Sequence, residues 1–136
     1  LLPDDQYVWT KPRLVLIDEL AGSCGDAFPM LIKANHTAPL FGRRTMGLGG
    51  NVEAFGPLTN SLATLSLTRG TFTSHQDDET YVPGDFVENN GVQPDIEHVI
   101  TAADFRTGFV DYMAHFSAVI ASQIDQANQP APEQPE

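Results

Sequence analysis

RLVLIDELAGSCGDAFPMLIKAN, Arg13–Asn35, decides the fold because an apolar run gives way to a helical pattern within a few residues. The run at 13–17 lies between a proline and two acids, which predicts a strand buried on both faces, as in parallel sheets. Residues 25–35 are apolar almost all round, which predicts a buried helix ending at Asn35. APLFG, Ala38–Gly42, then predicts the second strand of a βαβ unit.

The pattern changes after this unit. SLATLSLTR, residues 61–69, alternates leucine with small polar residues, and we expect strands and turns from about Val52 to Phe72. TAADFRTGFVDYMAHFSAVIASQI, residues 101–124, has apolar residues at helical spacing, which predicts a helix with Thr101 as its N-cap and an aromatic stripe packed in the core. Residues 127–136 are rich in Pro and Gln, which predicts a disordered tail.

Composition limits the classes of function. The chain has 136 residues, about one domain, and its 18 acidic against 7 basic residues give a net charge of −11. This charge repels phosphate backbones and anionic lipid, so we expect neither nucleic acid nor a membrane surface as partner. No apolar run approaches the roughly 20 residues of a membrane span. The single cysteine leaves the redox compartment open. Because the sequence begins without Met, we expect a fragment of a longer protein.

The turn between the first strand and the helix has two candidate nucleophiles. Ser23 precedes a predicted helix N-terminus, where free N–H groups and the helix dipole favour negative charge. It could attack a carbonyl whose oxyanion sits against the backbone N–H of Cys24, or it could merely cap the helix. Cys24 could itself be a thiolate nucleophile, or a small buried filler. Asp26 fits a first-turn acid that complements the helix dipole, and we assign its side chain no catalytic task.

Three motifs in order resemble the catalytic core of the S41 serine peptidases. They are KPRLVLIDELAGSCGDAFPMLIKAN, PLFGRRTMGLGGNVE and VENNGVQPDIEHVITAADF, and the resemblance covers Lys11–Asp111. It implies an α/β fold with a crotonase/Clp-like spiral core: a βαβ unit, a β-rich segment and a C-terminal helix. Residues 1–126 would be the C-terminal part of the catalytic domain. The resemblance also makes Ser23 the nucleophile and puts the N–H of Cys24 in the oxyanion hole.

The resemblance further divides the family by its general base. One branch, the tail-specific processing proteases, uses a lysine within a T-x-G segment, which matches Thr45 and Gly47 here. Leu48 stands where that lysine would be, and it cannot accept a proton. The sequence is therefore more similar to the tricorn-like and chlamydial protease-like branch, whose base is a histidine helped by an acid just before G-V-x-P-D. Glu88 occupies that acid position; its other interpretation is a solvated loop carboxylate.

The general-base histidine has no clear candidate. In the histidine branch it lies far upstream of the serine, so we expect it outside this sequence and expect the isolated chain to be inactive, because an unassisted serine hydroxyl is a weak nucleophile. We interpret His36, His98 and His115 as surface or structural residues. His75, in the polar loop 74–85, is kept as a reserve base.

The expected function is that of a serine endopeptidase acting through an acyl-enzyme on a protein or peptide substrate, with the N-terminal part of the same protein as its other partner. We expect no cofactor and no metal, because no His, Cys and Asp cluster has ligand spacing. A periplasmic or secreted location is implied by the resemblance alone. Two alternatives stay open: a non-catalytic module for a hydrophobic ligand or peptide, as in the retinoid-binding proteins of the eye, and hydrolysis of an ester or thioester.

Overall fold

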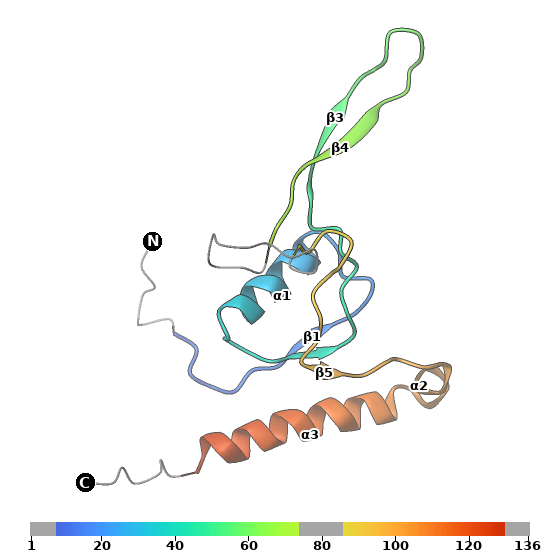
Figure 1. The fold of residues 1–136 in the computed structure, drawn as a ribbon. Helices are drawn as coiled ribbons and strands as arrows, with labels where there is room; N and C mark the ends of the chain where they lie inside the picture. The colour runs from blue at the N-terminus through green and yellow to red at the C-terminus, as the bar shows by residue number, and fades with distance from the viewer. Residues whose placement is uncertain (1–7, 74–85, 130–136) are drawn as a thin grey trace, which may run out of the picture. The chain divides into compact units, whose positions relative to one another are not determined.

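The computed structural model describes residues 8–73 and 86–129 and contains the expected βαβ unit (Figure 1). Strand β1 (Val15–Ile17) leads through helix α1 (Cys24–Ala34) to strand β2 (Leu40–Gly42), and β1 and β2 pair in parallel. Strand β5 (Ile96–Glu97) adds in parallel to the other edge of β2, so the sheet order is β1-β2-β5. The carboxyl ends of all three strands therefore lie at one edge of this sheet.

The core of this unit is small. Leu40 in β2 is 0% exposed, and it packs with four other buried residues: Ile17, Met30, Val87 and Val92. Two expectations of burial are wrong. Leu16 in β1 is 47% exposed, because β1 is an edge strand and only alternate side chains reach the core. In α1, Met30 is buried, whereas Phe28 and Leu31 are exposed, because only one face of the helix packs on this core.

A hairpin forms the β-rich segment and confirms the strands expected there. Strands β3 (Asn51–Phe55) and β4 (Leu65–Gly70) pair antiparallel, with Phe55 opposite Leu65. Every residue of both strands is exposed, and the hairpin extends away from α1 within its own unit (Figure 1). Two strands without a covered face are only marginally stable alone. The hairpin therefore contributes little to the core described above.

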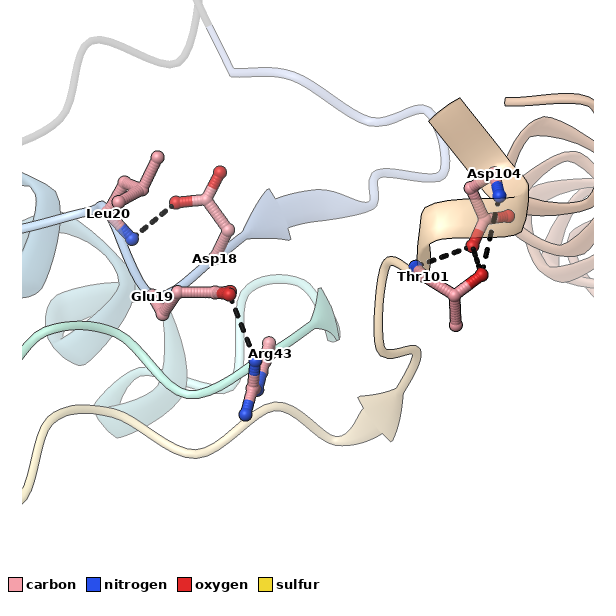
Figure 2. Close-up of polar contacts among 6 residues, drawn as sticks. All are labelled: Asp18, Glu19, Leu20, Arg43, Thr101 and Asp104. Atoms are coloured by element: carbon pink, nitrogen blue, oxygen red, sulfur yellow. Dashed lines mark hydrogen bonds and ion pairs between the residues drawn. The ribbon is translucent and has the colours of Figure 1, made fainter. Parts of the chain in front are cut away.

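Two helices belong to a second compact unit, whose described residues are 8–14 and 100–129, whereas the described residues 15–73 and 86–99 form the first. Helix α2 (Ala102–Thr107) begins at the predicted N-cap, and a capping box is present: the Thr101 hydroxyl accepts from the Asp104 N–H, and the Asp104 carboxylate accepts from the Thr101 N–H (Figure 2). The helix ends at Gly108, which has the left-handed conformation that glycine adopts without strain.

The prediction of a single long helix after Thr101 is wrong. Gly108 and Phe109 both have left-handed backbone conformations, and a new helix, α3 (Val110–Ala127), begins after them. The prediction that the aromatic stripe packs in the core is also wrong, because no residue of α3 is buried. The stripe instead stacks edge-on along its own helices, with the ring centroids of Phe105 and Phe109 4.9 Å apart. Of the expected tail, residues 130–136 lie outside the described residues.

Replacing Leu40 by Ala tests the core. We expect Leu40→Ala to lower the free energy of unfolding by about 2–5 kcal/mol, because it empties a fully buried site. The matched control is Leu65→Ala in β4, whose side chain is 50% exposed and has far less apolar contact to lose. Urea unfolding followed by circular dichroism measures both. Equal losses would contradict the position of the core.

Candidate active site

Ser23 lies on a tight turn between β1 and α1. The turn begins where the Asp18 carboxylate accepts the N–H of Leu20 at 2.9 Å (Figure 2). Ser23 then has φ 58° and ψ −113°, a conformation that costs a residue with a Cβ about 1–3 kcal/mol. Ser23 is the N-cap residue of α1 by position, but its exposed side chain makes no capping hydrogen bond. Among the described residues, the Ser23 hydroxyl has no hydrogen-bond partner.

Cys24 is the first residue of α1, and its thiol is exposed, so the buried-filler alternative is wrong. The carbonyl of Ser23 accepts the N–H groups of Asp26 and Ala27, at 3.0 Å each. Within the described part of the chain, the N–H of Cys24 itself donates to no acceptor. A free N–H at the positive end of a helix is suited to an anion or a developing oxyanion.

Asp26 holds the next segment against this turn. It is 0% exposed, and its two carboxylate oxygens accept the N–H groups of Gly47 and Leu48 at 2.9 and 2.8 Å. The N–H of Met46 donates to the carbonyl of Ala21, at 2.9 Å. Residues 45–50, the T-x-G-x-G segment, therefore lie beside the Ser23 turn. Sequence reasoning placed Asp26 in the first turn and missed these bonds.

Leu48 lies close to the residue before Ser23. A Cβ added to Gly22 would stand 3.7 Å from the Cβ of Leu48 and 3.2 Å from the sulfur of Met46. The position that a lysine general base would occupy is thus near Ser23, the candidate nucleophile, and carries an aliphatic side chain. Leu48 can supply packing there but no proton transfer.

A third segment, residues 87–92, joins the other two through Thr45. This threonine is 1% exposed; its N–H donates to the carbonyl of Val92 at 3.1 Å, and its hydroxyl oxygen accepts the N–H of Val92 at 2.7 Å. The N–H of Asn89 donates to the carbonyl of Gly47 at 2.8 Å. Gly91 makes this approach possible, since a Cβ there would stand 2.2 Å from the carbonyl oxygen of Thr45. The motif glycines and Thr45 therefore bring two loops into contact.

Glu88 is carried by this third segment and is half-buried. Its Oε2 accepts the N–H of Gly50 at 2.6 Å, a charge-assisted bond that fixes the carboxylate. Its Oε1 accepts no hydrogen bond from the described residues. Glu88 is therefore partly exposed and is hydrogen-bonded through one carboxylate oxygen. The three motif segments thus meet through backbone bonds and two carboxylates, those of Asp26 and Glu88.

Asp95 and Lys33 have structural contacts. Lys33 Nζ lies 3.0 Å from Asp95 Oδ1 and donates to the carbonyl of Gln93 at 2.7 Å, while Asp95 Oδ2 accepts the N–H of Leu40 at 2.8 Å. The acid of G-V-x-P-D therefore ties α1 to β2. Lys33, in the last turn of α1, is engaged at the opposite end of the helix from Ser23.

The described histidines lie in three separate places. His36 follows the C-terminal end of α1, which is about 16 Å long, so the helix separates it from Ser23. His98 stacks on Phe41 with ring centroids 5.7 Å apart, and His115 lies on α3 of the other unit. His75, the reserve base, lies outside the described residues.

Two further features are absent from residues 8–73 and 86–129. No three His, Cys, Asp or Glu side chains there gather in a way that could hold a metal ion. No helix in the same residues combines the length and the apolar character that crossing a membrane needs.

The profile of peptidase family S41 matches residues 2–98, and the chain belongs to this family. A protein of Chlamydia pneumoniae is 34% identical over 134 residues, which are 97% of this chain and 20% of that protein. One of Chlamydia muridarum is 36% identical over 127 residues, 90% of this chain and 20% of its own length. The chain thus spans about a fifth of the length of the curated relatives it matches.

Two solved structures share the fold. Mature CPAF, solved in complex with lactacystin, matches with a TM-score of 0.77 and 32% identity over 91% of this chain and 23% of its own. The tricorn protease matches with a TM-score of 0.61 and 27% identity over 81% of this chain and 10% of its own. The family and the α/β fold predicted from the motifs are therefore confirmed.

Replacing Thr45 by Val tests the junction of the loops. We expect Thr45→Val to lower the free energy of unfolding by about 1–3 kcal/mol, because the shape is kept while the buried N–H of Val92 loses its acceptor. Thr68→Val in β4 is the matched control, since Thr68 is exposed and valine favours strands. Denaturant unfolding of both variants measures the difference, and a Thr45→Val variant as stable as Thr68→Val would contradict the bond.

Proposed function

We propose that Ser23 is the nucleophile of a serine endopeptidase. Its hydroxyl attacks the peptide carbonyl, the amine leaves with a proton, and water then releases the acyl group from Ser23. The observation that carries this proposal is the strained backbone of an exposed serine whose side chain caps nothing. Strain of this kind is retained where a turn must present a nucleophile, as in the strand-to-helix elbows of other hydrolases.

The oxyanion would bind the backbone N–H of Cys24. This group has no acceptor among the described residues and stands at the positive end of α1, so it is available as negative charge develops on the substrate. The rival nucleophile, the Cys24 thiolate, is less well supported. Cys24 already has helical geometry, whereas the strained residue is Ser23.

Glu88 would orient a histidine base. The Gly50 N–H fixes one carboxylate oxygen and leaves Oε1 for the imidazole, the arrangement in which an acid sets the tautomer of a catalytic histidine. The lysine alternative has little support, because Leu48 has no basic group and Lys33 is bound to Asp95. These observations support the proposal that the chain belongs to the Ser-His-Glu branch of its family. The histidine would come from outside residues 1–136, which makes these residues inactive alone.

The substrate class would be peptide, with the rest of the same protein as structural partner. One of the two solved structures described above is the tricorn protease, and mature CPAF is solved with lactacystin, which makes this compound a useful probe here. A module that binds hydrophobic ligands without catalysis is the alternative from another class. Hydrolysis of esters or thioesters by the same serine is the alternative within the enzyme class.

Ser23→Ala should abolish covalent labelling of the intact protein by a fluorophosphonate, because the reagent needs an activated serine. Cys24→Ala is the matched control: it removes the neighbouring thiol but keeps the backbone N–H, so labelling should persist. In-gel fluorescence measures both variants, and lactacystin added first should compete.

Each rival predicts another result. Labelling that is absent from the wild type or equal in Ser23→Ala would favour the binding module, and labelling lost only in Cys24→Ala would identify the thiol. Ester hydrolysis without peptide hydrolysis would change the substrate class. Residues 1–136 alone should hydrolyse no peptide; hydrolysis that disappears in His75→Ala would put the base in this chain.

Gly50→Ala tests Glu88. A Cβ at Gly50 would stand 2.6 Å from Glu88 Oε2, so the carboxylate must move. We expect peptide hydrolysis by the intact protein to fall about 10–100-fold, the scale of an ångström of misplacement. Gly70→Ala is the control, because among the described residues a Cβ there would contact only Asn51, 3.9 Å away. Equal rates in the two variants would remove Glu88 from the mechanism.

A further inference from the structure

Asp26 is a buried acid that the proposed mechanism leaves unused. It is 0% exposed, and both of its carboxylate oxygens accept backbone N–H groups, from Gly47 and Leu48. These donors are 21 and 22 residues away in sequence, so the bonds join two segments of the chain rather than closing a local turn. A carboxylate is the only common side chain whose two oxygens accept without also donating.

The position of Asp26 links it to both proposed catalytic groups. On one side the backbone N–H of Asp26 donates to the carbonyl of Ser23 at 3.0 Å, so the backbone of Asp26 is hydrogen-bonded directly to the strained turn. On the other side it holds residues 47 and 48, and the same segment continues to Gly50, whose N–H binds Glu88. An unbroken path of bonds and short backbone segments therefore runs from Ser23 through Asp26 to Glu88.

We propose that Asp26 is a positioning residue that keeps the Ser23 turn and the Glu88 carboxylate at fixed positions relative to each other. The inference rests on the proposed function, since it assigns Asp26 a role only if these two groups act together. Displacement of the 47–50 segment moves Glu88 away from a histidine shared with Ser23. Small displacements of this kind reduce rates strongly, because reacting groups must be aligned before reaction.

Asp104 provides a matched comparison. It is also an aspartate in the first turn of a helix, it is 5% exposed, and its Oδ2 accepts both the N–H and the hydroxyl of Thr101, at 2.7 and 2.6 Å (Figure 2). These bonds with Thr101 are local to α2, which lies in the other compact unit. Replacement of either aspartate is thus expected to lower stability, whereas only the replacement of Asp26 is expected to change the reactivity of Ser23.

The experiment measures fluorophosphonate labelling of the intact protein over time, in the wild type, Ser23→Ala, Asp26→Asn and Asp104→Asn. An asparagine keeps the shape but turns an N–H donor toward one of the two backbone donors. We expect the maximal rate constant for labelling to fall about 10–100-fold in Asp26→Asn, with reagent affinity unchanged. Asp104→Asn should keep the wild-type rate constant. Partial unfolding lowers the labelled fraction but not the rate constant of the folded molecules.

Each outcome decides the matter. A wild-type rate constant in Asp26→Asn, or an equal fall in Asp104→Asn, would overturn the positioning role while leaving Ser23 in place. A wild type that labels no better than Ser23→Ala would instead overturn the proposed function. If Asp26→Asn gives no folded protein, hydrogen exchange of the wild type decides: the amides of Gly47 and Leu48 should exchange slowly, and rapid exchange would overturn the role.

Discussion

The buried carboxylate of Asp26, which accepts two backbone N–H groups from another loop, is the constraint on which the arrangement of the 15–99 unit depends. The strands of its parallel sheet have two or three residues each, so the ladders alone cannot fix the loops that follow them. A charge removed from water is costly unless hydrogen bonds replace its hydration. Here Gly47 and Leu48 supply those bonds, which hold their segment against the first turn of α1.

A small number of hydrogen bonds also explains how the exposed Ser23 keeps an unfavourable backbone conformation. The turn at Ser23 is held from one side by the strand before it and from the other by α1, whose N–H groups bind the Ser23 carbonyl. The T-x-G-x-G segment then closes on it through Met46 and Asp26. Strain of about 1–3 kcal/mol persists only where surrounding bonds over-determine it. Here those bonds come from the two elements that flank Ser23 and from the 45–50 segment, which is more than 20 residues away in sequence.

The sequence was enough to predict those structural features that depend on residues close together in the chain. The apolar run before Asp18 and the helical run after Ser23 were enough to predict a βαβ unit, and Thr101 was recognised as an N-cap from its position. The break at Gly108 was missed because a single glycine within helical periodicity does not by itself end a helix. The bonds of Asp26 were missed because their donors are over 20 residues away. The one available signal was an acid within an otherwise apolar helix.

Cys24 has a practical use that does not depend on its role in the reaction. It is the only cysteine in the chain, its thiol is exposed, and it adjoins Ser23. A thiol-reactive fluorophore would therefore attach at one place, with no background from other cysteines of these residues. Because the label would stand at the start of α1, its emission would respond to any molecule that approaches the Ser23 turn. The native sequence thus contains its own attachment point for an optical reporter.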